Sequence, residues 1–290
     1  MNFNRIGVVT GANKGIGLAI VRQLALQYPA SPLNNGQFLV YLTARDDARG
    51  NEALNQLEND AQLKKARALA ADGGLTTLKF HNLDIRNAGS IQALRDYLKA
   101  THPDGIDFVI NNAGIAMQGF DDNVVENTLR VNYYGTLETT TALVSTLRPS
   151  GRIVNVASVS GSLRSYSSSL KSRFINASVV EDVNTLMQEF TDAVKAGDHE
   201  KQGWPSAAYA VSKAGLIAQT RALAQQYKSE GRDVLINSCH PGYVVTDMTR
   251  GGGNKTPDQG AQTPVLLAIA DIEWKTGTYW SDEKEVDWAA

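Results

Sequence analysis

The chain has 290 residues, of which 42% are hydrophobic and 20% are charged, and its formal net charge is -2. A chain of this length and composition is able to bury one large core, so we expect a single domain over residues 1–290. Acidic and basic residues are interspersed, which excludes a basic face for nucleic acid or for an anionic membrane. We therefore expect a small-molecule partner.

The number of cysteines and the residues at the start of the chain bear on the cellular compartment in which the protein is expected. Cys239 is the only cysteine, which excludes an intrachain disulfide, and no apolar signal region follows Met1. No apolar run approaches the roughly 20 residues that a membrane-spanning helix requires. The histidines, which lack the spacing of metal ligands, are His81, His102, His199 and His240. We expect a cytoplasmic protein with no metal site and no membrane contact.

The first motif lies in "VVTGANKGIGLAI", residues 8–20. A β-branched run breaks at Gly11, passes Gly15 and Gly17, and resumes as a helical pattern, which predicts a strand, a tight turn and a helix N-terminus. Glycine lets a ligand approach the backbone, and the free N–H groups of a first helical turn favour a phosphate. Such turns also join strands to helices for structural reasons alone.

Short apolar runs recur between longer amphipathic stretches. Their separations accommodate crossover helices, which predicts a parallel sheet covered by helices on both faces. The predicted strands are Ile6–Thr10, Phe38–Ala44, Leu78–Ile85, Ile106–Asn111, Arg152–Ser158 and Val234–Cys239. This order predicts a doubly wound α/β fold of the Rossmann type, in which ligands bind at the C-terminal ends of the strands.

Residues 161–203 interrupt this alternation. The stretch Ser165–Ser169 predicts a surface loop, and Ser178-Val-Val-Glu181 matches a capping box. Apolar residues then recur at helical spacing at Val179, Val183, Leu186, Met187, Phe190 and Val194. We expect an inserted amphipathic helix that packs on the body of the domain. Gly251–Gly253 predict either a mobile loop near the active cleft or a plain flexible connection.

Tyr209 is the only tyrosine with a lysine four residues later, Lys213, and both lie in a strong helical pattern. The two side chains therefore share one helix face. A cation about 5 Å from a phenol, at an effective dielectric of about 20, favours the phenolate by roughly 3 kcal/mol, or about two pKa units. Such a tyrosine is suited to proton transfer, although a solvated pair on a helix surface has the same spacing.

Further motifs stand at the ends of the predicted strands, and together with Tyr209 and Lys213 they resemble the short-chain dehydrogenase/reductase family. The matching residues are Thr10-Gly11-Ala-Asn-Lys-Gly15-Ile-Gly17, Asp84-Ile85, Asn111–Gly114, Asn132, Ser158, Tyr209 with Lys213, and Pro241-Gly242 followed by Thr246. They occur in order from residue 6 to about residue 250. The resemblance implies the Rossmann-type fold and a nicotinamide cofactor.

The resemblance also implies a role for each catalytic residue. Tyr209 would donate a proton to a substrate carbonyl oxygen as a hydride arrives from the nicotinamide, and Ser158 would hydrogen-bond the same oxygen. Lys213 would lower the pKa of Tyr209 and bind the nicotinamide ribose, and Asn132 would hold a water that relays protons. The implied cofactor contacts are Gly11, Asn13, Lys14, Gly15, Ile16, Gly17, Arg45, Asp84, Ile85, Asn112, Ala113, Gly114, Tyr209, Lys213, Pro241, Gly242, Val244 and Thr246.

The end of the second predicted strand bears on the choice between NAD and NADP. An NAD site has a carboxylate there for the ribose 2′-hydroxyl, whereas this chain has Arg45. Arg45 suits a 2′-phosphate, and Lys14 in the glycine turn supplies a second cation. Asp46 and Asp47 are adjacent and favour NAD, but the two cations lead us to expect NADP(H).

Within the family, the chain resembles in particular the monomeric carbonyl reductases that reduce aldehydes, ketones and quinones. This likeness rests on "LTARD" at 42–46, "NNAGIA" at 111–116, "GWPSAAYAVSK" at 203–213, "PGYVVTDM" at 241–248, "SDEKEVDW" at 281–288 and the long interval between Ser158 and Tyr209. The implied apolar substrate pocket consists of Ile115, Met117, Val159, Trp204, Tyr243 and Met248. The insertion would cover the helices through which other members dimerise, so we expect a monomer unless the insertion leaves that face free.

Other functions compete with this one. An α/β hydrolase is disfavoured because neither Ser158 nor Ser160 lies in a Gly-x-Ser-x-Gly motif. A non-catalytic NADP-binding sensor would use the same sheet and glycine turn, but it would not need the four catalytic residues together. An NADP-dependent alcohol dehydrogenase would run the same chemistry in the oxidative direction. We predict an NADPH-dependent carbonyl reductase.

Overall fold

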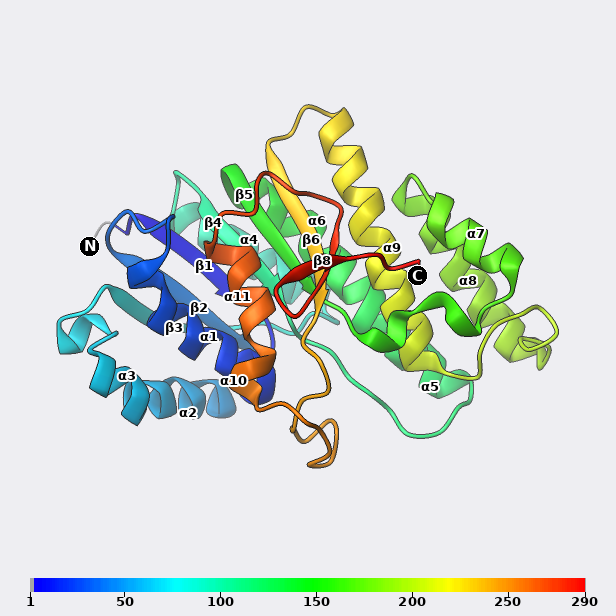
Figure 1. Ribbon diagram of the computed structural model, residues 1–290, viewed down its shortest axis with the longest axis horizontal. Helices are drawn as coiled ribbons and strands as arrows, with labels where there is room; N and C mark the ends of the chain where they lie inside the picture. Colours follow the sequence, from blue (N-terminus) through cyan, green and yellow to red (C-terminus); the bar gives the residue numbers. More distant parts are fainter. Residues whose placement is uncertain (1–2, 290) are drawn as a thin grey trace.

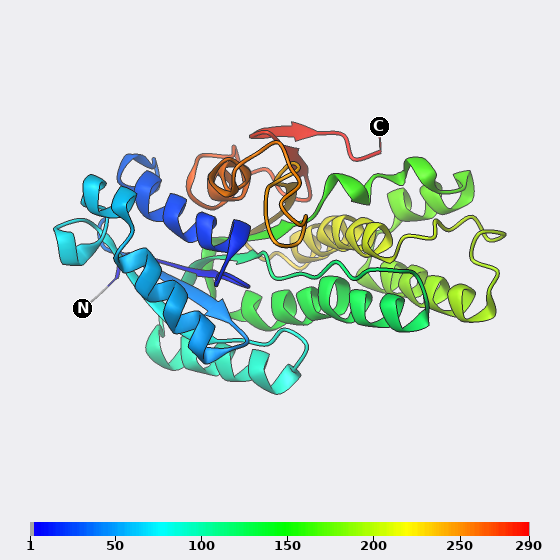
Figure 2. The ribbon, with the colours of Figure 1, turned by 90° about the horizontal axis from the view of Figure 1, so that it is seen from below.

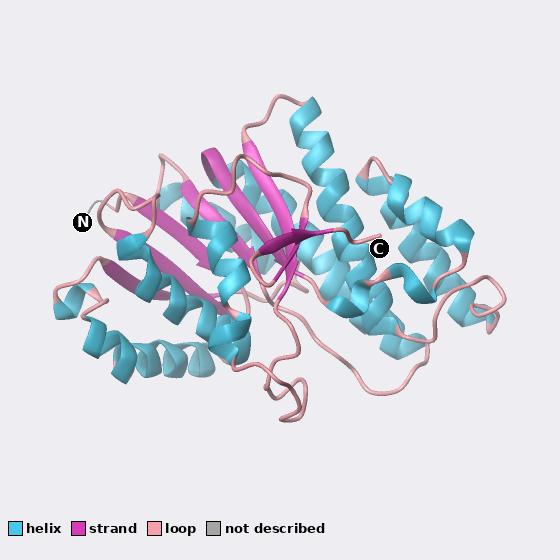
Figure 3. Cartoon of the chain, in the orientation of Figure 1, coloured by secondary structure: helices cyan, strands magenta, loops and turns pink. Residues whose placement is uncertain are grey.

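The computed structural model describes residues 3–289, so the ends of the predicted domain, residues 1–2 and 290, lie outside the described residues. Its centre is one eight-stranded sheet in the order β3-β2-β1-β4-β5-β6-β7-β8 (Figures 1 and 3). Neighbouring strands are parallel except for β8, which is antiparallel to β7. The strands are β1 Arg5–Val9, β2 Phe38–Ala44, β3 Thr76–Asn82, β4 Ile106–Asn111, β5 Leu147–Val156, β6 Val234–His240, β7 Tyr279–Ser281 and β8 Lys284–Val286. The predicted doubly wound α/β fold is confirmed.

The six predicted strands correspond to β1 to β6; β2 and β4 have the predicted boundaries, and the boundaries of the other four are shifted. Strand β3 ends at Asn82, before the predicted Ile85, and β5 begins at Leu147, well before the predicted start. The sequence does not predict β7 and β8. Each has only three residues, which is too short for a detectable hydrophobic period.

Helices cover both faces of the sheet (Figure 2). On β2, Phe38, Val40 and Leu42 belong to the core beneath α1, α2 and α11, whereas Leu39 and Tyr41 belong to the core beneath α4. This alternation is the two-residue period of a strand. The helices are α1 Gly15–Gln27, α2 Asp47–Glu58, α3 Ala61–Ala66, α4 Ala88–Thr101, α5 Asp122–Leu129, α6 Thr136–Leu143, α7 Ser168–Asn176, α8 Val180–Ala196, α9 Ala208–Ser229, α10 Pro257–Gly260 and α11 Gln262–Ile269.

Residues 3–289 contain neither a membrane-spanning helix nor a cluster of metal-ligating side chains. None of the helices there is both long enough and apolar enough to cross a membrane. In the same residues, no group of His, Cys, Asp and Glu side chains is arranged to hold a metal ion.

The insertion contains two helices, α7 and α8, where the sequence predicts one. The prediction of a surface loop at Ser165–Ser169 is wrong. Ser167 caps α7, because its Oγ accepts the N–H of Leu170 at 3.3 Å. Tyr166 is buried, and its ring lies 5.4 Å from that of Phe174. The serines therefore begin a helix whose Phe174 enters the core together with Tyr166, which precedes the helix.

The predicted capping box of α8 is displaced by one residue. Asp182, rather than Glu181, accepts the N–H groups of Ser178 and Val179, at 2.9 and 3.3 Å, because α8 begins at Val180. Helix α8 then packs against α5 and α9. The side chains of α8 that are buried in the hydrophobic core shared with α5 and α9 are Val183, Leu186, Met187, Phe190, Ala193 and Val194.

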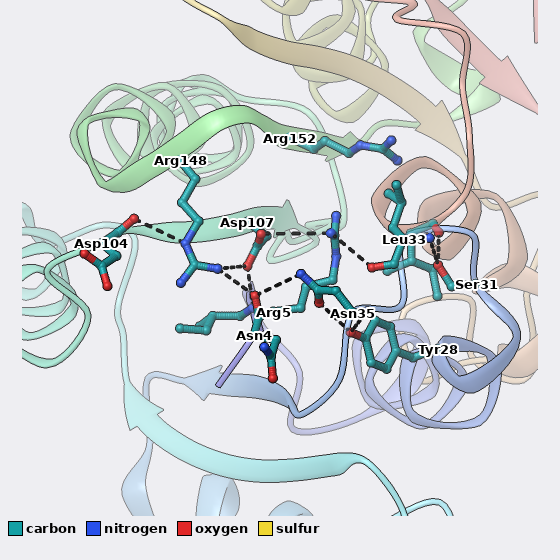
Figure 4. Close-up of polar contacts among 12 residues, drawn as sticks. Asn4, Arg5, Tyr28, Ser31, Leu33, Asn35, Asp104, Asp107, Arg148 and Arg152 are labelled. Atoms are coloured by element: carbon teal, nitrogen blue, oxygen red, sulfur yellow. Dashed lines mark hydrogen bonds and ion pairs between the residues drawn. The ribbon is translucent and has the colours of Figure 1, made fainter. Parts of the chain in front are cut away.

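The edge where the parallel strands begin is closed by an ion network (Figure 4). Asp107 on β4 accepts the N–H of Ile6 at 2.6 Å and a guanidinium N–H of Arg148 at 3.0 Å. A guanidinium nitrogen of Arg5 lies 3.9 Å from the same carboxylate. Arg152 on β5 donates to the last carbonyl oxygens of α11, where the helix dipole favours a cation. The residues predicted for the site lie at the opposite edge of the sheet.

Candidate active site

The glycine turn after β1 is fastened to the turn after β4. Thr10 Oγ1 accepts the N–H groups of Asn112 and Ala113, both at 3.0 Å. In return, Asn112 Nδ2 donates to the carbonyl oxygens of Thr10 and Gly11. Gly17 permits this close packing, because a Cβ there would lie 2.4 Å from the carbonyl oxygen of Gly11. Two strand ends are thus held together as one ligand-facing surface.

The N-terminus of α1 is suited to an anion. Gly15 has a φ of +56°, and a Cβ placed on it would meet the Thr246 side chain at 3.5 Å, an ordinary contact. Lys14, at the N-cap, makes no side-chain cap, and the first turn of α1 contains no acidic residue. Its N–H groups and helix dipole therefore fit the pyrophosphate of a dinucleotide. Asn13 and Ile16 stand in the same turn.

The end of β2 presents a cation beside two carboxylates that are already engaged. Arg45 is exposed. Asp46 caps α2 by accepting the N–H of Arg49 at 2.9 Å, and Asp47 accepts Nδ2 of Asn82 at 2.8 Å. These residues fit a ribose 2′-phosphate better than a 2′-hydroxyl, because the guanidinium is the group left to meet a ligand.

Lys14, the second predicted phosphate cation, pairs with Asp247 in the loop after β6. Its Nζ lies 2.7 Å from the carboxylate, and the two side chains are 62% and 79% exposed. An ion pair this exposed contributes little to stability because water screens it, so Lys14 is able to exchange Asp247 for a phosphate. The same loop contains Val244, which is buried and forms a β-bridge with Lys255.

Asp84 and Ile85 follow β3. The carboxylate of Asp84 pairs with Arg86 at 2.6 Å, and this hydrogen bond is the main cause that holds the pKa of Asp84 below its ordinary value. Ile85 is buried, and its carbonyl oxygen lies 2.6 Å from where a Cβ on Gly135 would stand. This strand end is therefore packed tightly against the segment that carries Asn132.

Ser158, Tyr209 and Lys213 come together beyond the end of β5. The Oγ of Ser158 accepts the N–H of Ser160 at 3.1 Å, which leaves the hydroxyl hydrogen of Ser158 to be donated elsewhere. Lys213 Nζ lies 5.6 Å from the centre of the Tyr209 ring and donates to the carbonyl oxygen of Val156 at 2.9 Å. A proton donor, a polar partner and an ammonium group therefore share one site.

The pKa of Tyr209 lies above its ordinary value, whereas a nearby Lys213 ammonium favours a lower one. Burial raises the pKa of Tyr209, and the hydrogen bond with Ser158 lowers it by a smaller amount. Burial also lowers the pKa of Lys213, to about 8, so the ammonium charge is itself disfavoured. Helix spacing predicts the attraction between the two groups but not the desolvation that opposes both charged forms.

Asn132 lies in the π-helical segment Arg130–Gly135, between α5 and α6, and is fully buried. Its Nδ2 donates to the carbonyl oxygen of Ile115 at 2.9 Å and to Oγ of Ser212 at 3.0 Å, and its Oδ1 accepts the N–H of Ile115 at 2.8 Å. One acceptor position of Oδ1 remains. A π-turn of this kind occurs frequently at functional sites.

Most of the predicted pocket residues have accessible side chains. Val159, Tyr243 and Met248 are 60%, 58% and 46% exposed, and Ile115 and Met117 are half-buried. Trp204, also predicted to line the pocket, is almost fully buried. It is 3% exposed, and its ring packs 5.2 Å from that of Phe190, because it joins the insertion to the core beneath α9.

Sequence reasoning missed two residues beside the catalytic group. Tyr279 on β7 donates its O–H to the carbonyl oxygen of Ser158 at 3.1 Å. Trp288 donates its indole N–H to the carbonyl oxygen of Gly161 at 2.8 Å. No local sequence pattern predicts either hydrogen bond, because more than a hundred residues separate each donor from its acceptor.

Comparison with known proteins bears on the whole chain. The short chain dehydrogenase family model matches residues 5–170 and 194–256, and so omits the centre of the insertion. Carbonyl reductase (NADPH) 3 of Rattus norvegicus is 41% identical over 275 residues, which cover 92% of this chain and 91% of that protein. Carbonyl reductase (NADPH) 1 of Homo sapiens is 37% identical over 294 residues, which cover 98% of each.

A solved structure agrees with these relatives. Salutaridine reductase from Papaver somniferum has a TM-score of 0.80 and 28% sequence identity, over 96% of this chain and 99% of that one. The glycine turn, the Asn112 turn and the group of Ser158, Tyr209 and Lys213 lie within the two segments that the family model matches. The chain belongs to the short-chain dehydrogenase family.

Proposed function

We propose that the protein is an NADPH-dependent carbonyl reductase that converts aldehydes, ketones or quinones to alcohols. The observation that carries the proposal is the meeting of Ser158, Tyr209 and Lys213 at the strand ends next to the glycine turn. Relatives that match nearly the whole chain bear the name carbonyl reductase (NADPH). Arg45 at the end of β2 supports NADP(H) as the cofactor.

In this proposal NADPH, when bound, supplies a hydride for the carbonyl carbon. Tyr209 donates a proton to the carbonyl oxygen, and Ser158 donates its free hydroxyl hydrogen to the same oxygen. Lys213, held by the carbonyl of Val156, keeps its ammonium group beside the phenol as the phenol loses its proton. Lys213 then passes a proton to the Tyr209 phenolate, and a water held at the remaining acceptor position of Asn132 returns a proton to Lys213.

The other predicted contacts keep their assignment to the cofactor. The glycine turn and Lys14 bind the phosphates, and Lys213 also binds the nicotinamide ribose. The residues that line the rest of the dinucleotide are Asp84, Ile85, Asn112, Ala113, Gly114, Pro241, Gly242, Val244 and Thr246. The substrate meets the accessible apolar side chains of Ile115, Met117, Val159, Tyr243 and Met248, which suits a broad range of carbonyl compounds.

The proposal is tested by following NADPH absorbance over a panel of aldehydes, α-diketones, quinones and bulky ketones. We expect turnover on several of them. Tight NADPH binding without any turnover would favour a non-catalytic sensor. Faster oxidation of alcohols with NADP⁺ than reduction of any carbonyl compound would favour an alcohol dehydrogenase.

We also propose that the chain acts as one domain and as a cytoplasmic monomer. Its only cysteine, Cys239, is buried, and acidic and basic residues are interspersed along the sequence with a net charge of -2. The monomer is supported by α8, which packs against α5 and α9 within the same chain. These are the faces through which a partner subunit would otherwise dock.

A further inference from the structure

The turn that carries Ser158 is held at both ends by the last segment of the described chain. Tyr279 donates to the carbonyl oxygen of Ser158 at 3.1 Å, and Trp288 donates to that of Gly161 at 2.8 Å. Between them, the N–H of Gly161 donates to the carbonyl of Ser158 at 3.0 Å. Both aromatic donors are buried.

Tyr279 is itself held rigidly. It lies on β7, which pairs with β6, and its ring lies 5.9 Å from that of His240. Beyond β7, Asp282 forms an ion pair with Lys255 of the loop after β6. The hydroxyl of Tyr279 therefore reaches Ser158 from a fixed support.

We propose that Tyr279 is a positioning residue for carbonyl reduction: it holds the backbone of Ser158 so that the Ser158 hydroxyl faces Tyr209 and the substrate oxygen. The inference rests on the proposed function. A second donor on the Ser158 carbonyl is not needed to satisfy that oxygen, which already accepts the N–H of Gly161. What Tyr279 adds is a tie between the turn and β7, which limits how the turn can rotate.

The test compares Tyr279→Phe with a matched control, Tyr28→Phe. Tyr28 is also buried, and its O–H donates to Oδ1 of Asn35 at 3.0 Å, at the edge of the sheet away from Ser158 (Figure 4). Tyr279→Phe loses one phenolic hydrogen bond, and Tyr28→Phe loses two, because the Tyr28 hydroxyl also accepts the N–H of Asn35 at 3.1 Å; both variants keep the ring. Tyr279→Phe leaves no buried acceptor without a partner, because the Ser158 carbonyl keeps the N–H of Gly161.

We expect Tyr279→Phe to lower kcat roughly tenfold while the Kd for NADPH changes by less than about twofold, as when a group near the reacting atoms is misplaced. Amide hydrogen exchange in residues 157–162 should be faster than in Tyr28→Phe. The fall in reduction rate at alkaline pH should move to higher pH, because a weaker hydrogen bond from Ser158 lets the pKa of Tyr209 rise. In a Ser158→Ala background, Tyr279→Phe should have no further effect on kcat.

Two results would overturn the inference. One is a Tyr279→Phe variant that matches Tyr28→Phe in kcat, in pH profile and in exchange of residues 157–162. The other is the same fold-loss of kcat from Tyr279→Phe whether position 158 is serine or alanine, since the tyrosine would then act independently of Ser158. If the wild type reduces no carbonyl compound, the proposed function fails, and the exchange measurement still decides whether Tyr279 holds the turn.

Discussion

At the scale of single residues, burial in the candidate site disfavours the charged forms of Tyr209 and Lys213, and hydrogen bonds favour them. Tyr209 and Lys213 both lose water, which favours the neutral phenol and the neutral amine. The hydrogen bonds from Ser158 to the phenol and from Lys213 to the carbonyl of Val156 work in the other direction. A neutral phenol is the form that can donate a proton, so the raised pKa of Tyr209 suits carbonyl reduction.

The phenol should therefore be required for turnover but not for cofactor binding. We expect Tyr209→Phe to keep its affinity for NADPH within a few-fold and to lose most of kcat, because the proton is transferred only in the transition state. Steady-state kinetics and NADPH fluorescence titration measure the two quantities. Tyr227→Phe, a buried tyrosine on the same helix, is the control. Near-normal turnover in Tyr209→Phe would refute the mechanism.

The sign of the pH dependence follows from the same residue. Reduction needs the protonated phenol, so its rate should fall as the pH rises through the pKa of Tyr209, and the raised pKa places this fall on the alkaline side. Oxidation of an alcohol needs the phenolate and should rise over the same range. Rate profiles in both directions check this prediction, and a reduction rate that rises over that range would contradict it.

Arg45 should determine the preference for NADPH over NADH. Arg45→Asp should weaken NADPH binding by more than about tenfold and affect NADH much less, since an ion pair with the 2′-phosphate is lost and a repulsion is added. Lys99→Asp, an equal charge change at an exposed position of α4, controls for the general electrostatic field of the protein. Equal binding of NADH and NADPH by the native protein would refute the assignment.

At the scale of elements, the strands are held in place at the edge opposite the site. Asp107 joins β1 and β4 through the N–H of Ile6 and shares its charge with Arg5 and Arg148 (Figure 4). The side chains of Arg5 and Asp107 are only 11% and 13% exposed, so this carboxylate is largely shielded from solvent. The ion pairs there should matter more than those on the surface.

Asp107→Asn should therefore destabilise the fold. We expect a loss of about 2–3 kcal/mol in the free energy of unfolding, because the substitution leaves Arg5 and Arg148 without their countercharge while keeping an acceptor for Ile6. Denaturant unfolding measures the loss. The control is Asp96→Asn, which removes an exposed partner of Arg95 and should cost less than about 1 kcal/mol. Equal effects of the two variants would contradict the prediction.

Of the two inserted helices, α8 is predicted by the local sequence pattern, whereas α7 depends on tertiary contacts. The apolar spacing from Val183 to Val194 correctly predicts α8, because a helix repeats its buried face every three to four residues. The nine residues of α7 are mostly polar, and the element depends on Phe174 and Leu170 reaching the core. The serine-rich start of α7 therefore predicts a loop, and only the tertiary contacts of Tyr166 show that its ring is buried.

At the scale of the whole molecule, α8 occupies the outer faces of α5 and α9 (Figures 1 and 2). We expect the native protein to sediment as a monomer of 31.3 kDa at micromolar concentration. A stable dimer with the insertion intact would contradict this prediction. A dimer that appears only when residues 165–200 are shortened would support it, because the apolar face of α9 would then need another cover.

The sequence by itself determines strands β1 to β6 and the glycine turn, and it predicts that Ser158, Tyr209 and Lys213 share one site. These rest on local patterns: buried strands are apolar throughout, turns need glycine, and helix spacing puts a tyrosine and a lysine on one face. The tertiary structure alone decides the pairing of Lys14 with Asp247, the burial of Trp204, the direction of the pKa shift in Tyr209 and the contact of Tyr279 with Ser158. Each of these depends on groups far apart in the chain, whose contact and loss of water exist only after folding.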